Sequence, residues 1–303
     1  MWFRNLQLYR LPVRWDMRID QLEDQLARRR FMPCGSQDPE SRGWLSPVGG
    51  DGPLVHAVGG QWLIALGIEH RLLPSSVVKQ EAEERAARIE LEQGFKPGRK
   101  QMKDLRDEVT REFMPRAFTR RTKVYAWIDP QDGWLAVDVA SVSRAEDILE
   151  ALRQSLDAFP LTLVRTETSP VAAMSDWLAG GDVPGNFTID MDCELKSVTE
   201  DKAAVRYVRH SLDGDEIKTH LQEGKLPTKL ALTWNDRVSF LLTDKGEIKR
   251  LQFLDVVQEE ASAGSEDAAE LFDAHFALMT GELRQLIPAV IGILGGELAT
   301  PAV

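Results

Sequence analysis

Ten lysine and arginine side chains lie between residues 96 and 123, and no other stretch of the chain gathers positive charge so densely. Only four acids accompany them, so this stretch carries +6, whereas the 303-residue chain carries −11 and the remainder −17. Cations gathered on one surface neutralise phosphates and release counterions, which favours nucleic-acid binding without sequence preference. A solvated charged face without a ligand is the alternative. The ten cations are Lys96, Arg99, Lys100, Lys103, Arg106, Arg111, Arg116, Arg120, Arg121 and Lys123.

Phe118 stands between Arg116 and Arg120, in a segment that we expect to be a loop. An aromatic ring among cations can stack on bases or wedge against them. The other interpretation is a core anchor that closes the loop. The two interpretations predict opposite exposures for the ring.

A second basic group consists of Lys202, Arg206, Arg209 and His210. Six bases meet six acids between residues 200 and 229, so only their arrangement in space can create a phosphate-binding surface. If residues 205–209 form a strand, Arg206 and Arg209 point to opposite faces. At most one or two of these cations would then face a phosphate together.

Asp190, Asp192 and Glu194 recur at every second position, which would place three carboxylates on one side of a strand. A two-metal nuclease requires such a cluster, and a solvated strand face is the simpler alternative. The sequence holds no Walker A motif, no dinucleotide fingerprint and no Gly-x-Ser-x-Gly elbow, and its five histidines are scattered. We therefore expect no catalytic residue, no metal site and no cofactor.

The basic stretch is expected to form a helical hairpin. One helix is predicted from Val77 to Gln93 and ends at Gly94, and a second runs from Arg99 to about Met114, because the residue before Pro115 disfavours the α conformation. Arg99, Lys103 and Arg106 share a face of this helix. The tip would carry Lys96, Arg99, Lys100 and Lys103 away from the core, as a finger. The apolar stripe of the second helix is Met102, Leu105, Val109 and Phe113.

The remaining pattern predicts an α+β fold with mixed antiparallel sheets and helices. Apolar spacing predicts a helix after Asp16, and Ser143 with Glu146 predicts a capping box for a helix extending to about Leu156. The order strand, strand, helix, strand in residues 123–165 resembles the pattern of residues 1–70, which suggests two α+β halves packed together before a boundary at 180–185. Strands are predicted at 2–11, 61–68, 123–128, 134–139, 161–165, 187–191, 203–209, 229–234, 238–242 and 248–253, with a short helix at 216–222.

The end of the chain alternates between acidic and apolar character. Residues 255–273 carry seven acids and no base, which predicts a solvated linker or an exposed helix start. A final apolar helix is expected from Ala268 to Leu294, either in the core or at a subunit interface. The sequence contains no run of about 18 apolar residues, so we expect no membrane span. Cys34 and Cys193 are isolated, which is typical of a reducing compartment.

Six long segments, in order along the chain, resemble the RdgC family of recombination-associated nucleoid proteins. The segments are FMPCGSQDPESRGW (31–44), LLPSSVVKQ (72–80), MPRAFTR (114–120), WIDPQDGWLAVDVAS (127–141), KLPTKLALTW (225–234) and FALMTGELRQLIPAVIGILGGE (276–297). The resemblance implies a bacterial cytoplasmic protein, associated with the nucleoid and without known enzymatic activity. It also implies a ring-shaped homodimer that encircles double-stranded DNA and opposes RecA.

The resemblance also carries site residues. The finger matches the family's basic helical hairpin, although KPGRK replaces a longer lysine-rich run, and Phe118 falls in the family's Pro-Arg-Ala-Phe motif. Arg206, Arg209 and His210 lie where the family has a basic patch. The predicted DNA-binding residues are Lys96, Arg99, Lys100, Lys103, Arg106, Arg116, Phe118, Arg120, Arg121, Arg206, Arg209 and His210.

We therefore expect a non-enzymatic protein that binds duplex DNA and limits RecA-dependent recombination, with single-stranded DNA as a further ligand left open and no membrane partner. The alternatives are a metal-dependent nuclease that uses Asp190, Asp192 and Glu194, and an acidic protein-interaction module without DNA. We predict three regions. Residues 1–75 with 115–180 form a central α+β region, 76–114 the finger, and 181–303 a C-terminal α+β region with the terminal helix.

Overall fold

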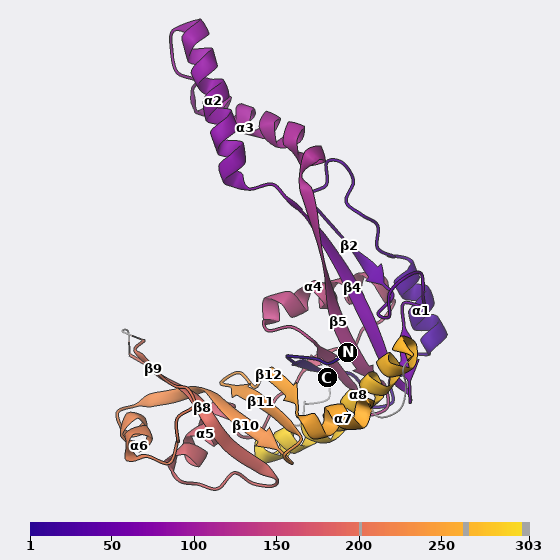
Figure 1. The fold of residues 1–303 in the computed structure, drawn as a ribbon, viewed down its shortest axis with the longest axis vertical. Helices are drawn as coiled ribbons and strands as arrows, with labels where there is room; N and C mark the ends of the chain where they lie inside the picture. The colour runs from indigo at the N-terminus through magenta and orange to yellow at the C-terminus, as the bar shows by residue number, and fades with distance from the viewer. Residues whose placement is uncertain (200–201, 263–266, 299–303) are drawn as a thin grey trace.

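The protein is an α+β structure with two antiparallel sheets, seen in a computed structural model that describes residues 1–199, 202–262 and 267–298 (Figure 1). The elements form an open arc. A helical hairpin stands at one end of the arc, a sheet built from residues 187–253 lies at the other, and a larger sheet joins them (Figure 1). The α+β class predicted from the pattern of elements is confirmed.

The larger sheet has the order β2-β4-β5-β6-β1-β7, and β3 pairs with β4. Successive residues of β4 are buried over most of its length, because the sheet is covered on both faces. Leu63 and Trp127 point into one core, while Ile64 and Ile128 point into the other. The strands are β1 (Gln7–Arg10), β2 (Glu40–Leu45), β3 (His56–Val58), β4 (Gln61–Leu72), β5 (Phe118–Asp129), β6 (Trp134–Val137) and β7 (Thr162–Leu163).

Two predictions for this region are wrong. Residues 1–70 and 123–165 do not form two packed halves, because β1 is inserted between β6 and β7 and all these strands share one sheet. The predicted Ser143 capping box is also absent, since helix α4 (Val142–Ser155) begins two residues earlier and the Ser141 hydroxyl accepts the N–H of Arg144. Together with α1 (Ile19–Ala27), α4 covers one face of the sheet.

The second sheet has the order β12-β11-β10-β8-β9. Helices α5 and α6 pack against it, and α5 was missed although Ser169 and Pro170 form a regular helix start. The elements are α5 (Pro170–Ala179), β8 (Phe187–Ser197), β9 (Ala204–Tyr207), α6 (Asp215–Gln222), β10 (Lys225–Trp234), β11 (Val238–Thr243) and β12 (Ile248–Phe253).

The acidic segment begins as a helix, α7 (Asp255–Ser262), rather than a linker, and Val257 is buried in the core. The part of this segment at 263–266 lies outside the described residues. Helix α8 (Ala268–Ile293) follows. Among the described helices, α8 alone is long and apolar enough to span a membrane by length and composition, but half of its most apolar window is buried. Phe276, Leu283 and Ile287 place it in the core between the sheets.

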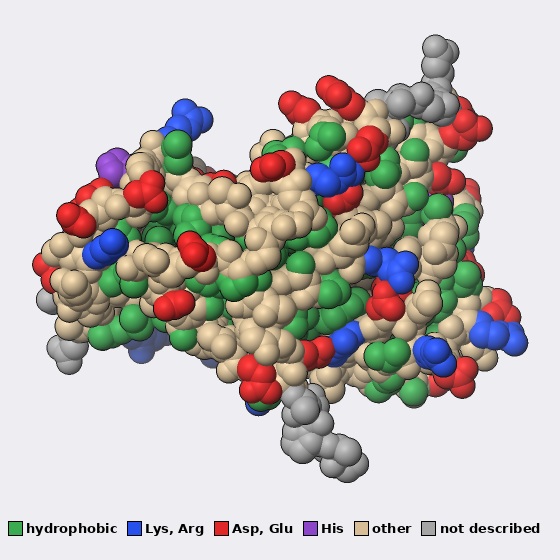
Figure 2. Space-filling view, turned by 90° about the horizontal axis from the view of Figure 1, so that it is seen from below, with side chains coloured by type: hydrophobic (Ala, Val, Ile, Leu, Met, Phe, Trp, Pro, Cys, Tyr) green, Lys and Arg blue, Asp and Glu red, His purple; other side chains and the backbone are tan. Residues whose placement is uncertain are grey.

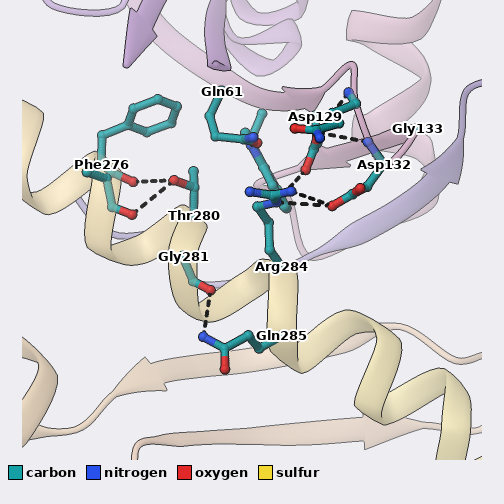
Figure 3. Close-up of polar contacts among 12 residues, drawn as sticks. Gln61, Asp129, Asp132, Gly133, Phe276, Thr280, Gly281, Arg284 and Gln285 are labelled. Atoms are coloured by element: carbon teal, nitrogen blue, oxygen red, sulfur yellow. Dashed lines mark hydrogen bonds and ion pairs between the residues drawn. The ribbon is translucent and has the colours of Figure 1, made fainter. Parts of the chain in front are cut away.

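An ion-pair cluster fixes α8 to the larger sheet. Figure 3 shows Arg284 reaching from α8 to the turn after β5. Its Nε lies 2.9 Å from a carboxylate oxygen of fully buried Asp129, and its Nη2 lies 2.7 Å from Asp132. The other carboxylate oxygen of Asp129 accepts the N–H groups of Gln131 and Asp132. The cluster therefore connects α8 to the larger sheet through a buried carboxylate.

The first strand joins the two sheets. Gln7–Arg10 pair with β6, whereas Leu6 pairs with Ile248 and the N–H of Leu251 donates to the carbonyl of Arg4. The predicted strand at 2–11 is therefore divided between two sheets. The proposed division into three regions stays a prediction.

The finger stands on the long outer part of β4 and β5, called the ribbon here, and β2 pairs with the other edge of β4 as far as His70. β4 and β5 pair over eleven successive positions, from Trp62 with Ile128 to Leu72 with Phe118, which corresponds to roughly 35 Å of strand. The inner half of β5 is buried and its outer half is exposed. From the outer end rise α2 (Ser75–Gln93) and α3 (Arg99–Phe113), and a 3₁₀ turn at Met114–Arg116 leads back into β5 (Figure 1).

The hairpin agrees with the predicted helices. Gly94 ends α2 with φ +79°, a conformation that glycine adopts without steric cost. Met114 keeps α-helical angles despite preceding Pro115, so the stated reason for the helix end was wrong, although its position was nearly right. Phe118 is the first residue of β5 rather than part of a loop.

Candidate nucleic-acid interface

The hairpin is held together by a small core of its own. Val78 and Ala82 of α2 are buried against Val109 of α3, and Leu105 and Phe113 cover them partly. Met102 is half-buried, so the predicted stripe of α3 is the face that meets α2. The opposite faces of both helices are free for charged side chains.

Charge within the hairpin is balanced overall but unevenly placed. Residues 75–113 hold nine cations and nine acids, so the finger as a whole is neutral and not basic. Arg85 joins the helices, with Nε 2.8 Å from Glu81 and Nη2 2.7 Å from Glu112. These two carboxylates therefore pair with a cation of the hairpin itself. The segment from 94 to 103 contains four cations and no acid, which concentrates positive charge at the tip.

The tip and one face of α3 present cations without partners. Within the described part of the chain, their side chains make no hydrogen bond or ion pair, and all are exposed. Arg99, Lys103 and Arg106 lie within one third of the helix circumference because they are spaced by four and three residues. The free cations are Lys96, Arg99, Lys100, Lys103 and Arg106.

The opposite end of the molecule has a different surface. Figure 2 shows acidic and basic side chains interspersed there, with hydrophobic side chains between them. Interspersed charges of opposite sign largely cancel at the distance of a ligand. The tip of the finger is therefore better suited to attract a polyanion than this end.

The root of the finger carries a second set of predicted residues. Residues 113–123 hold four cations and no acid, and Phe118, the first residue of β5, is 84% exposed. That exposure contradicts the alternative of a core anchor. Arg116 and Arg120 are exposed as well. The ring thus lies on the ribbon with cations before and after it in the chain.

Arg121 differs from its neighbours because it has a buried carboxylate partner. Its Nη2 lies 3.0 Å from Glu69, which is 4% exposed, and its guanidinium lies 4.4 Å above the ring of Phe31. The N–H of Cys34 donates to the other oxygen of Glu69, and this bond, followed by the bond from Arg121, holds the pKa of Glu69 below its ordinary value. Arg121 is thereby fixed to the ribbon.

The third predicted group lies on β8 and β9, at the far end of the arc (Figure 1). Arg206 pairs with buried Glu194 at 2.5 Å, and Lys196 and Lys229 approach the same carboxylate within 3.2 Å. Burial raises the pKa of Glu194, but hydrogen bonds from Thr228, Lys196, Arg206 and Lys229 outweigh burial and lower it to about 2. One carboxylate among three cations leaves a net charge of +2.

Arg209 and His210 follow β9 with different surroundings. Arg209 has φ +51°, and its backbone N–H donates to Asp192 while its side chain stays exposed. The ring Nδ1 of His210 lies 2.7 Å from the carbonyl oxygen of Ser211. The twelve predicted residues therefore form three separate groups, at the tip and α3, at the root, and on β8–β9.

The three carboxylates proposed for a nuclease do not converge. Asp190 accepts a hydrogen bond from Thr233, Asp192 pairs with Arg250, and Glu194 faces the cations described above. A register shift between β8 and β10 separates Asp190 from Glu194. In residues 1–199, 202–262 and 267–298, no three His, Cys, Asp or Glu side chains are grouped so as to hold a metal ion.

Two cations at the finger root escaped the sequence reasoning. Arg71 at the end of β4 and Lys79 on α2 line a groove together with Arg106. Arg71 is a single arginine between Glu69-His70 and Leu72-Leu73, and it carries no periodic signal. Only the hairpin's return to the ribbon brings it close to α3.

The fold and these surfaces define an α+β protein with a helical finger that presents unpaired cations. The family model described as "Putative exonuclease, RdgC" matches residues 1–297. The chain is 58% identical over 300 residues to the recombination-associated protein RdgC of Dechloromonas aromatica, covering 98% of each chain. It is 48% identical over 297 residues to the protein of that name from Cupriavidus necator, covering 98% of this chain and 99% of the relative.

A third relative, the recombination-associated protein RdgC of Herminiimonas arsenicoxydans, is 46% identical over 299 residues, with 99% of both chains covered. The chain belongs to the RdgC family, so the resemblance noted in the sequence is confirmed. The relatives are named for an association with recombination.

Proposed function

We propose that the chain is a non-enzymatic protein that binds double-stranded DNA without sequence preference and limits RecA-dependent recombination by occupying the duplex. The observation that carries this proposal is the group of five exposed, unpaired cations on the fingertip and α3, in a member of a recombination-associated family. Contacts to phosphate position a protein on DNA but carry no sequence information. Low sequence specificity follows.

We further propose that two copies form a ring around DNA in the bacterial cytoplasm, at the nucleoid. An arc with the finger at one end and a sheet at the other supports this arrangement, since two arcs joined at both ends enclose a hole (Figure 1). A closed ring would persist on circular duplex and slide from the free ends of linear duplex. Equal retention on both forms would contradict encirclement while leaving DNA binding intact.

The test of DNA binding reverses the charge of the α3 face. Substituting Arg99, Lys103 and Arg106 by Glu should weaken binding to several unrelated duplexes by the same factor. If the wild-type protein neutralises six phosphates, log K should fall against log salt with a slope of about −5. Failure of the wild-type protein to shift random-sequence duplex at low salt would instead favour a protein-interaction module.

The word exonuclease in the family description calls for a direct assay. We expect no cleavage of linear or plasmid DNA in magnesium or manganese, since Asp190, Asp192 and Glu194 have separate partners. Cleavage that is lost on Asp192→Ala would replace the proposed function by nuclease activity.

A further inference from the structure

A groove of about 820 Å³ lies at the root of the finger, where β4 leads into α2 and α3 returns to the ribbon. Three cations from three elements line it, namely Arg71 of β4, Lys79 of α2 and Arg106 of α3. None of its lining residues is acidic. Cations from separate elements around one groove repel each other, and a bound anion relieves this repulsion. The groove therefore favours an anionic ligand.

Arg71 is held in place without a neutralising partner. Its guanidinium donates to the carbonyl oxygens of Cys34, Gly35 and Ala117 through four contacts of 2.9 to 3.4 Å. A guanidinium has five N–H donors, so one remains free. Carbonyl groups fix its direction but carry no net charge. No carboxylate pairs with Arg71 in the described residues, so its positive charge is both oriented and uncompensated.

The other two cations are exposed and held by fewer contacts. Arg106 has no side-chain partner in the described part of the chain, and the Nζ of Lys79 lies 3.7 Å from Glu83, a distance typical of a weak exposed pair. Ser75 and Ser76 also line the groove. Long flexible side chains can therefore close on a ligand whose position Arg71 sets.

The apolar part of the lining narrows the class of ligand. Leu73, Val78 and Met114 line the same groove, and a bare inorganic anion would gain nothing from them. A deoxyribose ring offers apolar carbon surface beside a phosphate group. The volume also exceeds what a single phosphate group needs.

We propose that this groove binds a sugar-phosphate unit of a DNA strand, with Arg71 fixing the phosphate and Lys79 and Arg106 closing on it. The inference rests on the proposed DNA binding and adds Arg71 and Lys79 to its surface. Arg106 belongs both to the groove and to the cationic face of α3. The strand would therefore continue from α3 onto the ribbon.

The test compares single neutralisations inside and outside the groove. Lys79→Gln and Arg106→Gln remove groove cations, and Arg88→Gln and Arg111→Gln remove exposed cations from the same two helices. Arg71 is left intact because it holds three backbone segments. Affinity for a 30-base-pair random-sequence duplex is measured by fluorescence anisotropy across a salt series.

Each groove variant should bind about three- to tenfold more weakly at the reference salt, and its salt slope should be smaller by about 1. The matched controls should stay within about twofold of the wild-type affinity, with unchanged slopes. Groove variants that behave like their controls, beside a wild-type protein that binds duplex, would overturn the groove assignment alone. A wild-type protein that does not bind would overturn the proposed function as well.

A second arm tests free phosphate as the ligand. Inorganic phosphate is titrated into the wild-type protein by calorimetry, and it is also compared with chloride at equal ionic strength as a competitor of duplex. We expect no calorimetric binding and equal competition by the two anions. Saturable phosphate binding that disappears in Arg106→Gln would replace the DNA strand by a free phosphate ligand.

Discussion

Phe118 presents an aromatic ring to solvent at the first position of β5, directly across the ladder from Leu72. Burial cannot explain the ring, because it is 84% exposed. An exposed aromatic ring beside cations can stack on a base of a nucleic acid.

Phe118→Ala should leave stability within about 0.5 kcal/mol, since an exposed side chain is removed. Most of the electrostatic affinity for duplex DNA should remain, while displacement of a competitor already on DNA should be impaired. Anisotropy and a competitor-displacement assay measure the two effects, with Leu72→Ala as the control at the facing position. Equal losses of binding and displacement would indicate a structural role for the ring.

Glu194 is a buried carboxylate of the smaller sheet that faces three cations. Its pKa is lowered to about 2 in the folded protein, against an ordinary value of about 4.3. A carboxyl group whose pKa is lower in the folded protein than in the unfolded protein stabilises the folded state at pH values above its unfolded-state pKa. This stabilisation is lost as the pH falls through the pKa of the folded protein.

Glu194→Gln should therefore lower the free energy of unfolding by about 2 kcal/mol at pH 7, allowing for solvent around the three cations. The difference from wild type should shrink between about pH 4.3 and pH 2. Urea unfolding across this range measures it, and exposed Glu108→Gln serves as control. A difference that is constant with pH would mean that shape, not charge, is responsible.

Residue types revealed the cations but not their partners. The tip and α3 cations are recognisable from spacing because a helix places i, i+4 and i+7 on one face. Arg121 and Arg206 owe their surroundings to Glu69 and Glu194, which lie 52 and 12 positions away and meet them only through strand pairing. Nothing local distinguishes a paired arginine from a free one.

At the scale of elements, the finger depends on very little buried surface. Its buried residues in the two helices are Val78, Ala82 and Ala86 of α2 and Val109 of α3, all of them small, so its stability should be lower than that of the sheets. The hairpin was predictable because Gly94 and Pro97 interrupt a strong helical pattern. The length of β5 was not, because its outer half is polar and exposed, without the apolar alternation that predicts a strand.

Val109→Ala should destabilise the hairpin by about 1–2 kcal/mol through the cavity it leaves. Amide hydrogen exchange should accelerate in α2 and α3 but not in β10 or β11. Val77→Ala, at an exposed position of α2, provides a matched control with the same chemical change. If exchange also accelerates throughout the sheets, the finger is not an independent unfolding unit.

At the scale of the whole molecule, α8 determines how the two sheets sit together. Its apolar stripe predicted a buried or interfacial helix, but the sheet order could not be predicted, because interleaving of β1 between β6 and β7 leaves no local pattern. Arg284 connects this helix to Asp129, which is fully buried.

Arg284→Ala should cost about 2 kcal/mol of unfolding free energy, since it leaves a buried carboxylate without its cation. Thermal or urea unfolding measures the loss. Arg250→Ala removes a partner of Asp192 at an exposed site, and it should change stability by less than about 0.5 kcal/mol. Similar losses of unfolding free energy in the two variants would show that the burial of Asp129 does not increase the cost of removing its arginine partner.

The division of the first strand between two sheets has a consequence for biosynthesis. Arg4 and Leu6 find their partners only at Leu251 and Ile248, so these contacts cannot form until almost the entire polypeptide has left the ribosome. Contacts between such distant positions form slowly. During translation the start of the first strand would therefore stay unpaired until the last quarter of the chain emerges.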